Sequence, residues 1–178
     1  ESVTVTFQGE EAGYENVLGW YKLDSDGNPT EPKIIWQNAS EPGSGGDLAE
    51  GTTATLDGLA PGEQFGFFVI QNGASKYDWL NGQMQSNNSL QFGEDGGLQF
   101  VNNGGHVVKS IGADDLFYSG DASMNPDGQN HAISGVQGDE LMIGFEDLTG
   151  GGDNDFDDVT FSVKYDGVDG PQTATHDS

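Results

Sequence analysis

The sequence predicts an all-β fold, a β-sandwich of about ten short strands, and three features of the chain support this prediction. Apolar and polar residues alternate strictly over residues 3–7 and again over residues 159–165. A period of two is typical of a strand with one buried face. Between these segments lie short apolar runs bounded by Gly, Pro, Asn or Asp. The chain also carries 29 glycines, which supply turns, and no stretch keeps a helical period for long.

The expected strands follow one another along almost the whole chain. They are residues 3–7, the apolar runs 17–21, 34–36, 65–70, 98–101, 116–118 and 141–145, and finally residues 159–165. Turn-forming residues predict a hairpin turn at 24–29 and loops at 42–46 and 102–105. A single helical turn is expected at residues 77–80. Residues 1–165 therefore form one predicted domain, and the polar residues 166–178 form a linker or tail.

The composition limits the class of function. The chain has 178 residues, which fits one domain, and no cysteine, which excludes disulfides and thiolate metal sites. Thirty acidic residues face five lysines, for a net charge of −25. So few basic residues do not form the basic face that nucleic acids or anionic membrane surfaces require. Because this charge destabilises a compact chain through self-repulsion, high salt or bound cations must offset it.

An acidic segment between two apolar strands carries the strongest functional signal. It contains six carboxylates, which are Glu146, Asp147, Asp153, Asp155, Asp157 and Asp158. The flanking strands are expected to hold several of them close together, where unpaired carboxylates raise each other's pKa. A divalent cation removes that repulsion, so the segment predicts a metal site. A solvated acidic loop is the alternative.

The available ligand atoms favour calcium. Carboxylates and amides, in a chain with no cysteine and three histidines, suit Ca²⁺ or Mg²⁺, and an all-protein carboxylate cage fits Ca²⁺ best. Three consecutive glycines at 150–152 allow the chain to fold back around an ion. An EF-hand is excluded, because its sixth position requires glycine and Asp158 stands there when the count begins at Asp153. Tandem glycine-rich nonapeptides are also absent, so the site is expected to combine parts distant in sequence.

A second oxygen-rich segment, residues 119–131, is the expected partner of the first. Two of its residues are candidate calcium ligands, namely Asn125 and Asp127. That these two residues only form a plain turn is an equal alternative. Three more are candidate ligand-binding residues: Asp121, Ser123 and Gln129. His131 directly precedes a short apolar strand, where a hydrogen-bonded structural histidine is more common than a ligand.

These two segments resemble a family of calcium-dependent extracellular domains of bacteria. The closing signature of that family is G-F-E-D, a glycine-rich gap, D-x-D-F-[DN]-D and an alternating strand, and residues 144–163 are similar to it. Supporting similarities lie in residues 18–28, 61–70 and 125–131, so the resemblance covers roughly residues 14–165. The family occurs near the ligand-binding end of giant RTX adhesins. The chain looks most like the peptide-binding domain of such adhesins.

The resemblance implies a β-sandwich that holds several Ca²⁺ ions and is secreted to the bacterial cell surface. A bound Ca²⁺ with an open position would capture the C-terminal carboxylate of a target peptide on a host or neighbouring cell, and so mediate adhesion and biofilm formation. Within the motif, the six carboxylates form the acidic set, and the two candidate ligands of the second segment form its partner loop. We expect a monomeric module within a larger chain. Millimolar external calcium would stabilise such an acidic chain by mass action.

Three other functions fit the sequence less well. An enzyme is not expected, because the carboxylates cluster too densely to leave an acid with a raised pKa beside a free base, and neither H-E-x-x-H nor G-x-S-x-G occurs. A calcium-dependent carbohydrate-binding module is the main alternative. Trp20 and Trp36 are expected in the core, where they do not contact a sugar. Tyr77 and Trp79 lie in a polar segment and are candidates for the wall of the ligand site. A structural spacer is disfavoured by the non-repeating sequence and its long loops.

Overall fold

The structure is a computed structural model that describes residues 2–9, 15–39, 48–59, 63–86, 88–120, 132–137, 140–145 and 159–166. Strands dominate these residues, which confirms the predicted all-β class. The strands are β1 (Ser2–Gly9), β2 (Val17–Leu23), β3 (Pro29–Trp36), β4 (Thr53–Leu56), β5 (Gln64–Ile70), β6 (Ser89–Phe92), β7 (Leu98–Val101), β8 (Val107–Ile111), β9 (Leu116–Tyr118), β10 (Ala132–Gln137), β11 (Glu140–Phe145) and β12 (Val159–Asp166). The helical elements are α1 (Gly73–Lys76), α2 (Leu80–Gln85) and the 3₁₀ turn η1 (Ala113–Asp115).

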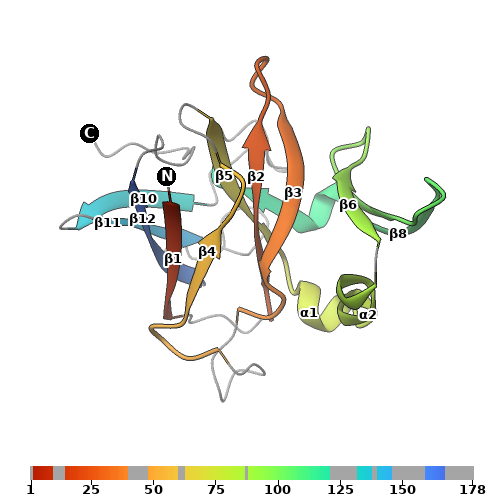
Figure 1. Ribbon diagram of the computed structural model, residues 1–178. Coiled ribbons are helices and arrows are strands. Elements are labelled where there is room, and N and C mark those ends of the chain that lie inside the picture. The colour runs from red at the N-terminus through yellow and green to blue at the C-terminus, as the bar shows by residue number, and fades with distance from the viewer. Residues whose placement is uncertain are drawn as a thin grey trace.

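The described strands form three antiparallel sheets (Figure 1). The five-stranded sheet has the order β10-β11-β12-β1-β4, the four-stranded sheet β3-β2-β5-β9 and the three-stranded sheet β6-β7-β8. In Figure 1 the four-stranded sheet lies in the centre, with the five-stranded sheet on the left and the three-stranded sheet and both helices on the right. β1 and β12 pair from Ser2 opposite Asp166 to Phe7 opposite Phe161, so strands from the two ends of the sequence are neighbours.

The five-stranded and four-stranded sheets enclose the first hydrophobic core. Val5 of β1 and Val163 of β12 enter it from one sheet and Phe67 of β5 from the other, and all three are fully buried. The ring centroids of Phe67 and Phe161 lie 4.9 Å apart, so this pair bridges the two sheets. The alternating apolar residues of β1 and β12 supply this core, except for the exposed Tyr165, and the predicted sandwich is confirmed.

A second hydrophobic core covers the other face of the four-stranded sheet. Tyr21 and Phe68, from β2 and β5, pack there with Leu98 of β7 and Leu80 of α2, and each is at most 1% exposed. The central strands of the four-stranded sheet are therefore buried on both faces. This explains why they are continuous apolar runs in the sequence, since only strands with one buried face need to alternate. The sandwich predicted from the sequence has two layers, and the structure adds a third.

The edge strands β4, β6 and β8 are not among the predicted strands. Each lies at the edge of its sheet, and most of its residues are exposed or half-buried. Partial burial leaves too few apolar residues for a clear strand pattern.

The helical turn predicted at residues 77–80 is wrong in its bounds. Residues 77–79 link α1 to α2, and Leu80 begins α2. Leu80 is 1% exposed in the second core, so α2 is held in place by tertiary packing rather than by its short sequence. Among the described residues, no helix has the length and apolar character needed to span a membrane.

Gly19 lies in the middle of β2, opposite Phe68 of β5, and substitution there is expected to destabilise the fold. A Cβ atom at this position would lie 2.2 Å from Cζ of Phe68 and 2.6 Å from the carbonyl oxygen of Lys33. We expect Gly19→Ala to lower the free energy of unfolding by about 1–3 kcal/mol, the usual cost of overpacking a filled core. Unfolding in urea measures this loss.

Gly112 offers the matched control for this prediction. It has an extended conformation with φ of −67°, and apart from its chain neighbours no described residue has an atom within 4 Å of the position that a Cβ would take. Gly112→Ala is expected to be neutral or to stabilise by about 0.4–1 kcal/mol, because alanine restricts the unfolded chain. Equal losses of stability in the two variants would contradict the packing argument.

Candidate functional site

Most of the candidate site residues lie outside the described part of the chain. This holds for all eight candidate calcium ligands, which are Asn125, Asp127, Glu146, Asp147, Asp153, Asp155, Asp157 and Asp158. It also holds for Asp121, Ser123, Gln129 and His131. The strands to which both segments are attached are described, as are Tyr77 and Trp79. We call residues 146–158 the acidic segment and residues 121–131 the partner segment.

A short row of residues at one end of the five-stranded sheet marks where these segments are attached. Ala132, which begins β10, is paired with Phe145, which ends β11, and Phe145 is paired with Val159, which begins β12. Neighbouring strands in a sheet lie about 4.8 Å apart. The residue bonded to each of the three along the chain belongs to one of the two segments. The strand register thus brings together both attachment points of the acidic segment and one of the partner segment.

The other attachment point of the partner segment lies at the four-stranded sheet. Ser119 and Gly120 follow β9 and are both buried. The backbone N–H of Phe67 donates to Oγ of Ser119 over 2.9 Å, and the N–H of Ser119 donates to the carbonyl oxygen of Phe67 over 2.8 Å. These two bonds hold the end of β9 against β5. The two ends of the partner segment are therefore fixed by different sheets.

Aromatic packing supports the row of attachment points. The rings of Phe145 and Phe161 stack with their centroids 6.2 Å apart and their planes at 18°. Phe67 meets Phe161 from the opposite sheet, and Val159 is fully buried beside them. Binding residues are commonly carried on loops that a rigid, packed scaffold holds in place. The described strands provide such a scaffold for both segments.

Most of the lysines have partners outside the acidic segment. The sequence has no lysine between Ser110 and Val163. Four of the five lysines have such partners. Two form ion pairs, with Nζ of Lys22 3.4 Å from Oε1 of Glu63 and Nζ of Lys76 2.8 Å from Oδ2 of Asp115. The other two form cation–π contacts, Lys33 with Trp20 and Lys109 with Trp79. In the described ranges, no group of three or more His, Asp or Glu side chains is arranged to hold a metal ion. The prediction of a calcium site therefore rests on the acidic and partner segments.

Tyr77, the first predicted wall residue, is hydrogen-bonded to the carboxylate of an ion pair. Its hydroxyl donates a hydrogen bond to Oδ2 of Asp115, and Nζ of Lys76 lies 2.8 Å from the same oxygen. Burial raises the pKa of Tyr77 above its ordinary value, and the hydrogen bond and charge of Asp115 raise it further. Tyr77 thus fastens α1 to η1.

Trp79, the second predicted wall residue, is half-buried and has neighbours on several sides. The rings of Tyr77 and Phe100 meet its ring in T-shaped contacts with centroids 5.5 Å and 5.9 Å away. Nζ of Lys109 lies 5.4 Å from the centre of the indole ring. Phe100 also lines a pocket, which connects the predicted wall to that pocket.

Of the two other tryptophans, Trp20 lies in the first core, as the sequence predicts, whereas Trp36 is only partly buried at its edge. Trp20 is 3% exposed in the sandwich interior. Trp36 is half-buried and packs against the same core, with its ring 5.8 Å from that of Phe7.

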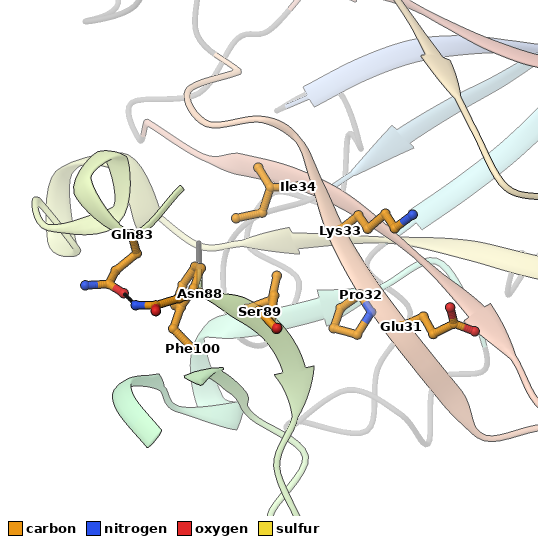
Figure 2. Close-up of a pocket in the computed structure, with 9 residues that line it drawn as sticks. Glu31, Pro32, Lys33, Ile34, Gln83, Asn88, Ser89 and Phe100 are labelled. Carbon is orange, nitrogen blue, oxygen red and sulfur yellow. Dashed lines mark hydrogen bonds between the residues drawn. The ribbon is translucent and has the colours of Figure 1, made fainter. Parts of the chain in front are cut away.

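A pocket of about 400 Å³ lies between β3, α2 and β6 (Figure 2), and the sequence analysis does not predict it. Its lining residues are Glu31, Pro32, Lys33, Ile34, Gln83, Asn88, Ser89, Leu90 and Phe100. One sequence signal for this pocket is Pro32, since proline within a strand pattern indicates a sheet edge. Glu31, just before it, has a φ of 51°, which is uncommon for a residue other than glycine.

Alkaline pH is expected to destabilise the fold through three tyrosines. Burial raises the pKa values of Tyr21, Tyr77 and Tyr118 above the ordinary value of about 10. The folded state therefore favours the neutral phenol. This contribution to stability is fully present below about pH 10 and is lost as the pH rises toward the raised pKa values. Urea unfolding at increasing pH measures the loss, and Tyr118→Phe should reduce its slope. An unchanged slope in that variant would contradict the assignment.

The comparisons with known proteins identify a family and no single relative. No curated protein and no solved structure matches the chain. A family model described as a domain of unknown function, DUF4114, matches residues 59–166, which is more than half of the chain. The matched interval ends with β12 and includes both the acidic and the partner segment. The chain therefore belongs to the DUF4114 family.

Proposed function

We propose that the chain is a calcium-dependent ligand-binding module of a secreted bacterial RTX adhesin, which binds target proteins through the C-terminal carboxylate of a peptide and mediates cell adhesion. The observation that best supports this proposal is the register that aligns Ala132, Phe145 and Val159. It holds both attachment points of a segment with six carboxylates beside one attachment point of a second oxygen-rich segment.

The chemistry of the two segments fits calcium. Their candidate ligands are six carboxylates, one further aspartate and one asparagine, which is an all-oxygen set. Ca²⁺ takes about six to eight oxygen ligands in adaptable geometry, and carboxylates distant in sequence can share it. Bound Ca²⁺ would supply positive charge and an open coordination position for the carboxylate of a peptide. The carboxylates of the chain would hold the ion, and the packed strands would fix their attachment points.

The net charge of the chain fits an extracellular setting. At −25, self-repulsion opposes folding where calcium is scarce. Ions that bind only the folded state stabilise it by mass action, so an external medium with millimolar calcium would favour the folded protein. This argument supports secretion to the cell surface as part of the proposal.

Peptide binding is tested with a library of peptides in two forms, one with a free C-terminal carboxylate and one amidated. Binding to the full chain is measured by fluorescence polarisation in Ca²⁺, in Mg²⁺ and in EDTA. We expect binding only for free carboxylates and only in Ca²⁺. Equal binding of amidated peptides would contradict carboxylate capture. Calcium-dependent binding of glycans without peptides would instead support the carbohydrate-binding alternative.

Substitutions in the acidic segment test which residues hold calcium. We expect Asp155→Asn and Asp157→Asn each to weaken calcium binding by about tenfold or more, since each removes a negatively charged ligand. Isothermal titration calorimetry with CaCl₂ measures the affinity. Asp114→Asn is the matched control, because this exposed carboxylate lies in η1, outside both segments. Unchanged affinity in the acidic-segment variants would remove them from the ligand set.

A further inference from the structure

The described residues that line the pocket between β3, α2 and β6 lie outside the strands to which the acidic and partner segments are attached. Its volume of about 400 Å³ is within the range of about 300–1,000 Å³ that is common for small-ligand pockets. Pro32 and Ile34 provide apolar surface on the β3 side, and Leu90 and Phe100 provide it on the β6 and β7 side. Figure 2 shows Ile34 and Pro32 across the pocket from Phe100.

The backbone of β3 favours a compact ligand over an added peptide strand. Opposite Tyr21 of β2, β3 carries two residues, Glu31 and Pro32, and so forms a bulge. Pro32 has no N–H to donate to a neighbouring strand. Bulges and prolines prevent edge strands from pairing with other chains. An extended peptide therefore cannot continue the sheet along this part of the pocket.

Two side-chain amides leave hydrogen-bonding groups at one side of the pocket. Nδ2 of Asn88 donates to Oε1 of Gln83 over 2.7 Å. Neither the side-chain Nε2–H groups of Gln83 nor the side-chain oxygen of Asn88 has a hydrogen-bond partner among the described residues. The lining of the pocket thus includes amide donors and an amide acceptor, and the hydroxyl of Ser89 is a further polar group of the lining. A ligand with neighbouring hydroxyl groups can both donate and accept there.

The charged groups that line the pocket are directed away from these amides. In Figure 2 the carboxylate of Glu31 and the ammonium of Lys33 point away from Gln83 and Asn88. Nζ of Lys33 lies instead 5.7 Å from the centre of the Trp20 ring. A charged ligand would therefore lose its hydration at the amides without gaining an ion pair. These features favour a neutral ligand.

We propose that this pocket binds a neutral saccharide, and that it does so without calcium. A pyranose ring presents C–H groups, which suit the apolar walls, and hydroxyl groups, which suit the amides of Gln83 and Asn88. Pockets that combine apolar walls with a few placed polar groups are typical of small-ligand sites. This inference does not rest on the proposed peptide-binding function, because it uses none of the residues of the acidic or partner segment.

The test is a titration of the ¹⁵N-labelled full chain in Ca²⁺-containing buffer, repeated in EDTA with NaCl at the same ionic strength, because the proposal requires binding in both buffers. The probes are the methyl glycosides of glucose, galactose and mannose and methyl N-acetylglucosaminide. We expect at least one of them, at millimolar concentration, to shift the backbone amide signals of Ile34, Gln83 and residues 88–90. Single neutral sugars with few contacts bind in this range of affinity.

Two tryptophan variants on one strand provide the matched comparison. Ser89 is exposed and lines the pocket, so Ser89→Trp should fill it and weaken glycoside binding by about tenfold or more. Gln91 is also exposed, two residues further along β6, and does not line the pocket. Gln91→Trp should bind glycosides as the unmodified chain does. Urea unfolding of both variants verifies that their stabilities agree.

Three outcomes would overturn the proposal. The first is that none of the glycosides shifts the signals of the pocket residues. The second is that the shifted signals lie at the row of Ala132, Phe145 and Val159 instead, which would assign the sugar to the acidic and partner segments. The third is that N-acetylphenylalanine amide shifts the pocket signals while the glycosides do not, which would assign the pocket to a peptide side chain.

Discussion

Calcium is expected to raise the midpoint of thermal unfolding of this chain, whereas Mg²⁺ at the same ionic strength is not. One site filled at a hundred times its dissociation constant adds about 2.7 kcal/mol to the free energy of unfolding. In a domain of this size, each kcal/mol corresponds to about 2–4 °C, so each site should raise the midpoint by about 5–10 °C. Several sites would add their effects.

The size of this effect follows from the charge of the chain. Six carboxylates lie within the acidic segment, and the sequence has no lysine between Ser110 and Val163. If the segment holds calcium as proposed, these carboxylates would repel one another in EDTA, and bound Ca²⁺ would both remove the repulsion and link the attached strands. Mg²⁺ prefers to keep several of its water ligands and is a poor substitute in an all-protein cage.

Scanning calorimetry in EDTA, CaCl₂ and MgCl₂ measures the shift, with NaCl added to equalise the ionic strength. Asp157→Asn should reduce the Ca²⁺ shift, and Asp114→Asn should leave it unchanged. A similar rise with Ca²⁺ and Mg²⁺ would indicate general charge screening. No rise with Ca²⁺ would contradict the calcium site and, with it, the adhesin resemblance.

A fragment of residues 59–166, the interval that the family model matches, is expected not to fold by itself. This interval lacks β1, β2, β3 and β4. Without β1, β12 loses one of its two neighbours in the five-stranded sheet, and without β2, β5 loses one of its two in the four-stranded sheet. The fragment would expose two hydrophobic strands that now lie inside sheets.

The missing strands also contribute much of both cores. Val5 and Phe7 of β1 and Leu18 and Trp20 of β2 belong to the first core, and Tyr21 of β2 belongs to the second. Removal of a single large core side chain costs about 2–5 kcal/mol, and whole domains are stable by only about 5–15 kcal/mol. The loss of all these residues therefore exceeds the stability of a typical domain.

Urea unfolding and near-UV circular dichroism distinguish the two outcomes. The full chain should show one cooperative transition and the fragment none. Addition of a peptide of residues 1–58 should restore the near-UV signal, because it supplies the four missing strands. A cooperative transition in the fragment alone would contradict the view that β1 and β2 are integral to the fold.

The fold could be predicted from the sequence where a strand has one buried face and one exposed face. Val3, Val5 and Phe7 are buried and alternate with partly exposed threonines, and the strand that they predict is present as β1. The runs at β2 and β5 also predict strands, but such runs do not reveal what covers each face. The second core depends on residues such as Leu98 and Leu80, which are distant in sequence from β2. For this reason the third layer could not be predicted.

The candidate site shows the same division. The ligand types predict an ion from local chemistry alone, and that prediction stays open, since those residues lie outside the described ranges. The polarity of their segment predicts that Tyr77 and Trp79 form a ligand wall outside the core, whereas in the structure Tyr77 is hydrogen-bonded to Asp115 and Trp79 packs against Phe100. The pocket beside them could not be predicted, because β3, α2 and β6 meet only in the folded chain.

The antiparallel pairing of β1 with β12 also determines how the domain would respond to tension. Ser2 lies opposite Asp166, so a force applied between these two residues would open the ladder at one end and break its hydrogen bonds one after another. A parallel arrangement would instead share the force among all of the bonds at once. Because the two residues are paired, their Cα atoms lie only about 5 Å apart. The folded domain would therefore add almost nothing to the end-to-end length of a longer polypeptide that contains it.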